Sequence, residues 1–342
     1  MSRHIFITLF FGIGLLGLCK AQNSTQNNVI DTIPLDNPEP YRKINKEVDY
    51  RYHKIATGDD ECQLYVKEAG LSSGNAIIFL HGGWGMEHTP LAKYFVNHLD
   101  LINNHRLVFY DQRGSMRSPC KDYDSISVSK HVEDLERIRK KLKIDDFKIV
   151  GWSMGSYLGY KYLEKYGNNV DGFVSIGPLP IYKYDSLKRE DNVNVKKKML
   201  SRSAYQKVLE ETELNKKEKS QLTPKELYKY NKISLVGMNL FNVSRWQCFE
   251  GAYGVHRKAR MAAGRSMSSE WNFRSILENV HYKPIFIVGD IDYVSDSYPK
   301  YFKSFEKTEG IKLYYLEKTG HTAFIDRPGT IKNIIEKAWL SD

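Results

Sequence analysis

Cysteine is scarce in this chain, and the few cysteines form no metal-binding pattern. Only four of the 342 residues are Cys. None of them makes a C-x-x-C pair or stands near histidines at zinc-ligand spacing. We therefore expect no structural metal and no bound cofactor. Internal repeats, low-complexity tracts and heptad patterns are also missing, which excludes collagen-like and coiled-coil architectures.

The sequence offers no apolar run long enough for a comfortable membrane span. The N-terminal run Ile5–Leu18 is shorter than the about 20 residues that a spanning helix needs. A basic start precedes this run and a small residue, Ala21, follows it, which is typical of a secretory signal peptide over residues 1–21. We predict an exported protein, periplasmic or extracellular, with residues 22–45 as a flexible leader and no transmembrane span after cleavage. The alternative is a lipoprotein acylated at Cys19.

Removal of the signal peptide leaves an odd number of cysteines. Cys62, Cys120 and Cys248 remain. An odd count in an exported protein allows at most one internal disulfide and leaves a spare thiol. The sequence leaves open whether any two of the three pair.

Basic residues exceed acidic ones, and the formal net charge is +10. Such a balance is compatible with nucleic acid, with an anionic membrane face, or with solubility alone. The lysines and arginines are spread along the chain, and no nucleic-acid reading motif accompanies them. We therefore predict no nucleic-acid partner.

Short apolar runs alternate with helical patterns from about residue 50 onward. Continuous apolar runs of this length are typical of strands buried on both faces of a parallel sheet. The intervening segments place apolar residues at helical spacing. Strands that alternate with helices predict an α/β fold with a doubly wound, mostly parallel sheet. The predicted strands are residues 76–80, 107–110, 147–150, 173–176, 284–288 and 313–316, and the clearest helices are 132–142, 157–166 and 331–340.

The alternation stops in one long segment. Residues 180–280 are rich in lysine, helical in character and free of strand-like runs. We predict that they form a helical cap inserted into a catalytic domain made of residues 46–179 and 281–342. The cap should lie over the carboxyl edge of the sheet, where open α/β sheets bind ligands.

A serine motif joins a predicted strand to a predicted helix. Gly151–Gly155 reads G-x-S-x-G, with Ser153 at its centre. A strand before it and a helix after it are the context of a nucleophile elbow, in which a tight turn exposes the serine hydroxyl. We predict Ser153 to be a catalytic nucleophile.

A glycine-rich segment follows another buried strand. His81–Gly85 reads His-Gly-Gly-Trp-Gly. Glycines let backbone N–H groups approach a substrate closely. We predict that the N–H groups of Gly83 and Met154 form an oxyanion hole, which stabilises the charge that develops in the tetrahedral intermediate.

Acid and base candidates follow the last two predicted strands. Asp292 lies just after residues 284–288, and His321 lies just after residues 313–316. The chain order Ser, Asp, His matches that of enzymes with a nucleophile elbow. His321 is predicted to be the general base and Asp292 to orient it. Asp290 and Asp296 are the alternatives for the acid.

These motifs together resemble the proline iminopeptidases and related peptidases of the α/β-hydrolase fold. The resemblance rests on His81–Gly83, the Asp-Gln-Arg-Gly segment 111–114, Gly151–Gly155, Asp292 and Gly320-His321, and covers residues from about 50 to the end. It implies an α/β-hydrolase fold and release of an N-terminal residue from short peptides. Three positions depart from the family pattern and leave the residue preference open, namely Trp84, Met116 and Met154.

The predicted cap carries a further part of the resemblance. Trp246–Gly251 is similar to the W-x-x-W-E-G segment of the family, whose glutamate helps to bind the free α-amino group of the substrate. The resemblance assigns this role to Glu250. Glu270 is a candidate for a second carboxylate by rough position, and Trp84 is a candidate for lining the substrate pocket. A carboxylate suits an ammonium that enters a partly dry pocket.

The sequence therefore predicts an exported serine hydrolase of proline iminopeptidase type, acting on a small peptide or ester. One alternative is an esterase or lipase of the same fold, which needs no amine-binding carboxylate. Another is a non-catalytic binding protein on the same scaffold. Epoxide hydrolases and dehalogenases are disfavoured, because their relatives have Asp where this chain has Ser153. No oligomeric state follows from the sequence.

Overall fold

The structure of the chain is a computed structural model. It describes residues 29–33, 48–59, 61–98, 100–183, 199–251, 255–292, 305 and 308–340. The predicted signal peptide and Asp296 lie outside these residues. Within them, no helix combines the length and the apolar character that crossing a membrane requires.

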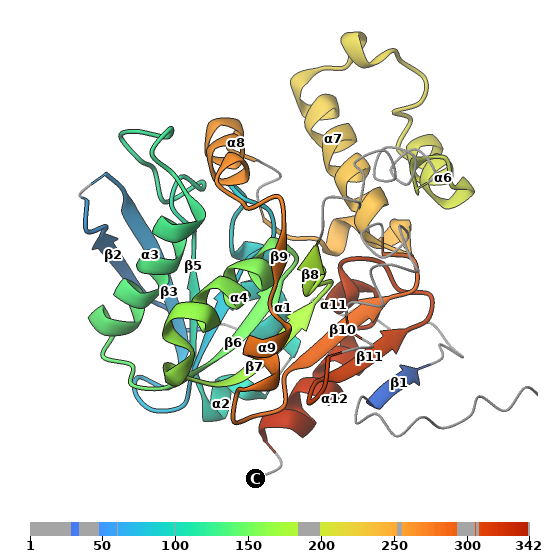
Figure 1. The fold of residues 1–342 in the computed structure, drawn as a ribbon. Coiled ribbons are helices and arrows are strands. Elements are labelled where there is room, and N and C mark those ends of the chain that lie inside the picture. Colours follow the sequence, from blue (N-terminus) through green and yellow to red (C-terminus); the bar gives the residue numbers. More distant parts are fainter. Residues whose placement is uncertain are drawn as a thin grey trace, which may run out of the picture.

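A single large sheet forms the centre of the molecule (Figure 1). Among the described residues this sheet has nine strands, in the order β1-β11-β10-β7-β6-β4-β5-β3-β2. The strands are β1 (Val29–Ile33), β2 (Arg51–Ala56), β3 (Gln63–Gly70), β4 (Ala76–Leu80), β5 (Arg106–Tyr110), β6 (Phe147–Trp152), β7 (Val170–Ile176), β10 (Ile285–Gly289) and β11 (Lys312–Leu316).

Most strand pairs in this sheet are parallel, which confirms the predicted fold class. Parallel pairing runs from β1 through β11, β10, β7, β6 and β4 to β5. The exceptions are β3 and β2, which continue the sheet beyond β5 in antiparallel pairing. All residues of β4, β5 and β10 are buried, as expected for strands covered on both faces.

One strand lies in the predicted flexible leader. Val29–Ile33 forms β1 and pairs in parallel with β11 at the edge of the sheet. This differs from the expectation of a leader without regular structure. The physical reason is that β11 has an unpaired edge, and an extended segment can satisfy its backbone hydrogen-bonding groups.

Helices cover both faces of the sheet. Buried side chains of α3 and α4 belong to one apolar core, and those of α1, α11 and α12 belong to the other. This two-sided cover is the doubly wound arrangement. The bounds are α1 (Thr89–His98), α2 (Leu101–Asn104), α3 (Val128–Lys141), α4 (Met154–Tyr166), η1 (Gly167–Asn169), α11 (Ala323–Asp326) and α12 (Pro328–Trp339).

The chain between β7 and β10, called here the insertion, adds mostly helices to this sheet. Its apolar residues around α6 and α7 form a third, smaller core. In Figure 1, α6 and α7 stand away from the main body, and α8 lies above the helices next to the sheet. The elements are β8 (Tyr182–Lys183), α6 (Ser203–Glu211), η2 (Lys219–Gln221), α7 (Pro224–Asn239), η3 (Val243–Cys248), α8 (Arg257–Arg265), β9 (Trp271–Asn272) and α9 (Arg274–Glu278).

The insertion rests on loops that follow strands of the sheet. The N–H of His256 donates to the carbonyl of Gly85, after β4, at 2.9 Å. The N–H of Thr322, after β11, donates to the carbonyl of Asn239 at 2.8 Å. The two contacts place the insertion at the carboxyl edge of the sheet.

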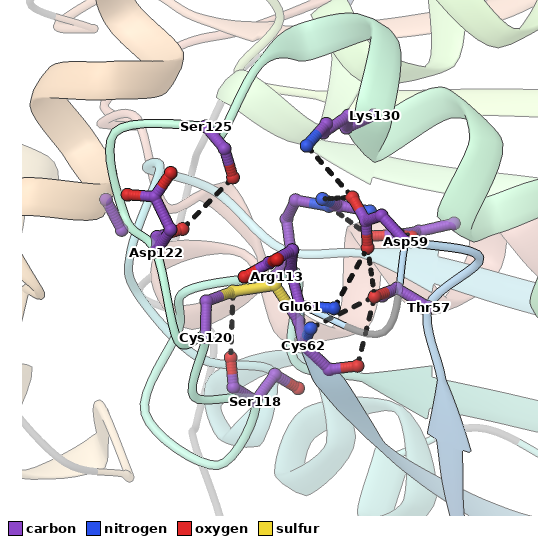
Figure 2. The surroundings of a disulfide bond; sticks show 12 residues. Thr57, Asp59, Glu61, Cys62, Arg113, Ser118, Cys120, Asp122, Ser125 and Lys130 are labelled. Carbon is purple, nitrogen blue, oxygen red and sulfur yellow. Dashed lines mark hydrogen bonds and ion pairs between the residues drawn. A yellow bond between two sulfur atoms is a disulfide. The ribbon is translucent and has the colours of Figure 1, made fainter.

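A disulfide joins Cys62 to Cys120 (Figure 2). It ties the start of β3 to the loop that follows β5. Beside it, Arg113 donates to Asp59 at 3.1 Å and to both oxygens of Asp134 on α3 at 2.7 Å. The third cysteine of the predicted mature chain, Cys248, takes no part in this bond. The structure thus selects one pairing from those that the sequence left open.

Candidate active site

Ser153 sits in a strained turn between β6 and α4. Its backbone has φ 54° and ψ −118°, a region that non-glycine residues rarely adopt. Strain of this kind persists only where the surrounding structure enforces it, and it is common at active sites. Only 8% of the surface of Ser153 is exposed. The residue is therefore held in a sheltered place, where a substrate could displace the remaining water.

The glycines of the motif are there because the turn is tight. A Cβ at Gly155 would lie 2.0 Å from the carbonyl oxygen of Leu80, the last residue of β4. A Cβ at Gly151 would lie 3.0 Å from the backbone of Gly155. Any side chain at these positions would push α4 away from the sheet and would move Ser153 with it.

The glycine-rich loop after β4 lies directly against Ser153. A Cβ at Gly82 would come within 3.0 Å of the Cβ of Ser153. Gly83 has φ +66°, and its carbonyl accepts the N–H of Met86 in a turn. Met154, half-buried, is the first residue of α4, where helix N–H groups have no partner within the helix. Of the two predicted oxyanion-hole residues, Met154 therefore directly follows Ser153, and Gly83 directly follows the glycine that packs against it.

Buried hydrogen bonds hold the glycine-rich loop in place. The side chain of Gln112 donates to the carbonyl of His81 at 3.0 Å, and its backbone N–H donates to Nε2 of His81 at 3.1 Å. Burial lowers the pKa of His81 to about 4, so its ring is neutral near pH 7 and can accept this bond. The loop after β5 thus positions the loop after β4.

His321 and Asp292 are in contact. Nδ1 of His321 lies 2.9 and 2.8 Å from the two carboxylate oxygens of Asp292. Their side chains are 2% and 0% exposed. A carboxylate at Nδ1 keeps the proton on that nitrogen and leaves Nε2 able to accept a proton.

Several contacts place this pair next to the serine turn. Nε1 of Trp152, the residue before Ser153, donates to the carbonyl of His321 at 3.3 Å. The N–H of Ser153 donates to the carbonyl of Ile176 at 3.1 Å. The next residue, Gly177, has φ +53°, and a Cβ there would lie 2.8 Å from Nδ1 of His321. The serine turn and the histidine ring therefore meet around the end of β7.

The structure distinguishes among the acid candidates it describes. The side chain of Asp290 accepts the N–H of Thr319 at 2.9 Å and so holds the loop that precedes His321. Asp292, two residues later, is the one that contacts the imidazole.

The predicted substrate-binding residues lie in different surroundings. Trp84 is buried, stacks on His131 at 4.7 Å, and donates to the sulfur of Met267 at 3.3 Å. The carboxylate of Glu250 is 26% exposed and lies 3.8 Å from Nζ of Lys93 on α1. Glu270 is exposed. Their roles in substrate binding stay predictions.

Sequence reasoning assigned no role to three residues that shape the site. Gly177 leaves room for the imidazole, Gln112 holds the glycine-rich loop, and Asp326 binds the backbone of Gly320 at 2.9 Å. A glycine directly after a buried strand was a signal for the first. No local pattern marked the partners of the other two.

No group of three or more His, Cys, Asp or Glu side chains among the described residues could hold a metal ion. The polar groups around Ser153 are those of acid–base and nucleophilic chemistry, namely a hydroxyl, an imidazole backed by a carboxylate, and backbone N–H groups.

The family comparison agrees with the fold. The alpha/beta hydrolase fold family matches residues 75–328 of the chain. The chain therefore belongs to this family.

Within the family, the chain resembles proline iminopeptidases. It is 31% identical over 140 residues to the proline iminopeptidase of Arabidopsis thaliana, covering 41% of this chain and 33% of that protein. It is 35% identical over 116 residues to that of Neisseria gonorrhoeae, covering 34% and 36%. The chain thus spans about a third of the length of these curated relatives.

Solved structures show the same fold at low identity. A proline iminopeptidase-related protein from Thermus thermophilus superimposes with a TM-score of 0.59 and 19% identity, over 86% of this chain and 98% of that one. A thermophilic esterase from Thermogutta terrifontis has a TM-score of 0.56 and 17% identity, over 85% and 98%.

Proposed function

We propose that the chain is a serine hydrolase in which Ser153, His321 and Asp292 form the catalytic triad. The observation that carries the proposal is the buried contact between His321 and Asp292 at 2.8 Å, beside a serine held in a strained turn. Such an arrangement costs folding free energy, and nucleophilic catalysis is the chemistry for which it is suited.

In the proposed reaction, Nε2 of His321 takes the proton of the Ser153 hydroxyl as its oxygen attacks the substrate carbonyl carbon. The N–H groups of Gly83 and Met154 stabilise the resulting oxyanion. His321 then gives the proton to the leaving group, and the acyl chain stays on Ser153. A water molecule attacks this ester with the same base, which releases the acid and restores the hydroxyl.

We further propose that the substrate is a short peptide and that the enzyme releases its N-terminal residue. The similarity to proline iminopeptidases supports this activity. Glu250 supports it physically, because a partly exposed carboxylate on the insertion can pair with a substrate ammonium. Nζ of Lys93 lies 3.8 Å from the same carboxylate, so Lys93 and the substrate ammonium would compete for Glu250.

The proposed domain arrangement follows from the contacts of the insertion. Residues 46–179 and 281–342 act as the catalytic domain, and residues 180–280 act as the cap that limits access to Ser153. The hydrogen bonds of His256 to Gly85 and of Thr322 to Asn239 support this arrangement, because both anchor the insertion beside the serine turn.

We also propose export to the periplasm or the extracellular space. The Cys62–Cys120 disulfide supports it, because disulfides form and persist mainly in oxidising compartments.

The direct test replaces the nucleophile. Ser153→Ala should abolish turnover of an aminoacyl-arylamide and labelling by a fluorophosphonate probe, with an unchanged melting temperature. Ser156→Ala is the matched control, because Ser156 lies in the first turn of α4, three residues after Ser153, and is buried against Ser175. Full activity of Ser153→Ala would rule out the proposal.

A second candidate is an esterase of the same fold. Lys93 favours it, because the Lys93 ammonium can pair with the Glu250 carboxylate, which is then not available to a substrate amine. Comparing an aminoacyl substrate with its N-acetylated form separates the two candidates. A peptidase that binds the free amine loses most of its kcat/KM on acetylation, whereas an esterase does not.

A further inference from the structure

Asp326, in α11, has a buried carboxylate that accepts three backbone N–H groups. Its Oδ2 accepts the N–H of Phe241 at 2.8 Å and the N–H of Gly320 at 2.9 Å, and its Oδ1 accepts the N–H of Asn242 at 3.1 Å. The residue is only 4% exposed. Bonds from N–H groups to an ionised carboxylate are among the stronger hydrogen bonds in proteins.

The three donors come from two parts of the chain. Phe241 and Asn242 belong to the insertion, just after α7, whereas Gly320 directly precedes His321. One oxygen, Oδ2, therefore binds both the insertion and the loop that carries the histidine. A shift of either segment changes its distance to this atom.

Neighbouring contacts also join the insertion to the segment around His321. The N–H of Thr322 donates to the carbonyl of Asn239 at 2.8 Å. Arg245 of η3 donates to the carbonyls of Ile325 and Asp326 at 2.8 Å. A Cβ at Gly320 would lie 2.6 Å from the carbonyl oxygen of Asn239. The two backbones thus pack too closely to slide past one another.

We propose that Asp326 is a positioning residue that couples the insertion to His321 and so keeps the imidazole aligned with Ser153. The inference rests on the proposed serine hydrolase function. It adds that the placement of the general base depends on how the insertion is docked, and that one carboxylate makes the connection.

The cost of this carboxylate to folding supports a functional role. Burial raises the pKa of Asp326 to about 6, although the backbone N–H bonds and Arg245 act in the opposite direction. The charged form is therefore held against a desolvation penalty that a neutral side chain would avoid. Residues that lower stability in this way are expected where geometry at an active site requires them.

The test is Asp326→Asn, which keeps the shape but can no longer accept hydrogen bonds with both terminal atoms. We expect kcat for an aminoacyl-arylamide to fall at least tenfold, KM to stay within threefold, and labelling of Ser153 by a fluorophosphonate to slow in parallel. Glu68→Gln is the matched control. Glu68 is equally buried, but on β3, where it contacts Arg106 and His53. In that variant the melting temperature should fall and kcat should stay unchanged.

The outcomes separate the two proposals. If the fluorophosphonate fails to label the unaltered protein, the hydrolase function itself is wrong. If it labels the unaltered protein and folded Asp326→Asn at the same rate, with equal kcat, the positioning role is wrong. Should Asp326→Asn not fold, Asp326→Glu is measured in its place, because it keeps the acceptors but displaces them by one methylene. Unchanged kcat in that variant also overturns the inference.

Discussion

Two buried histidine–aspartate pairs in this molecule make the same contact in different surroundings. Nδ1 of His321 lies 2.8 Å from Asp292, and Nδ1 of His88 lies 2.6 Å from Asp111. All four side chains are at most 2% exposed. Contact distance and burial therefore do not distinguish a catalytic pair from a structural one.

The neighbours of each pair make the distinction. Asp111 also accepts the backbone N–H groups of His88 and Arg117, at 3.0 and 2.9 Å, and so ties together the loops after β4 and β5. The ring of His88 stacks on Tyr65 at 5.6 Å. His321 instead lies beside Trp152 and the strained turn of Ser153. A pair becomes a candidate for catalysis when a nucleophile is presented next to it.

The largest difference between the two pairs is expected when the same substitution, Asp to Asn, is made in each. Asp292→Asn should lower kcat/KM by about a thousandfold or more, because the wrong tautomer of His321 is then favoured. Asp111→Asn should keep kcat/KM within about tenfold and instead lower the melting temperature, because it weakens a buried network. Steady-state kinetics and thermal melting check both. Equal losses of kcat/KM would show that the His88 pair is part of the catalytic machinery.

The second prediction concerns the loop that contains Asp111. The Cys62–Cys120 disulfide closes a loop over a sequence separation of 58 residues. Replacing both cysteines by serine should lower the free energy of unfolding by about 4 kcal/mol, chiefly by freeing the unfolded chain. The neighbouring Arg113–Asp134 pair should keep the loop folded in the native state.

We therefore expect the double cysteine variant to keep kcat at 25 °C, which denaturant unfolding and kinetics check together. A large loss of kcat without unfolding would instead mean that the disulfide positions the loops next to Ser153. The region around His88 and Asp111 would then affect catalysis as the region around His321 and Asp292 does.

The third prediction concerns pH on the His321 side. The pKa of Asp326 is raised from 3.8 to about 6 by burial. The folded state therefore binds this proton more tightly than the unfolded state, and the stabilisation present below pH 4 is lost as pH rises through 6. An asparagine at this position cannot titrate, so the Asp326→Asn variant lacks this loss, and its stability relative to the unaltered protein should increase by about 2 kcal/mol between pH 4 and pH 7.

Urea unfolding of both proteins at each pH measures that difference, and groups common to both cancel. Asp111 provides the contrast, because hydrogen bonding to His88 lowers its pKa in spite of burial. Asp111→Asn should therefore lose stability relative to the unaltered protein as pH rises toward about 4, and the difference should stay constant above that pH. The same trend for both variants would contradict the assignment.

Much of the fold could be predicted because its signals are local. The six predicted strands correspond to β4, β5, β6, β7, β10 and β11, since continuous apolar runs report burial on both faces. β2 and β3 were missed because Arg51–Ala56 and Gln63–Gly70 alternate in burial and carry charged residues. β1 was missed because edge pairing depends on a partner far along the chain.

The sequence by itself determined the fold family, the serine turn and the chain order of the candidate triad, because each depends on residues that are neighbours in sequence. The tertiary structure decided that Asp292 rather than Asp290 contacts His321, and that Cys62 pairs with Cys120. It also decided that Asp326 joins the insertion to Gly320. These are contacts between segments separated by many residues, and only the packing of the sheet, its helices and the insertion brings them together.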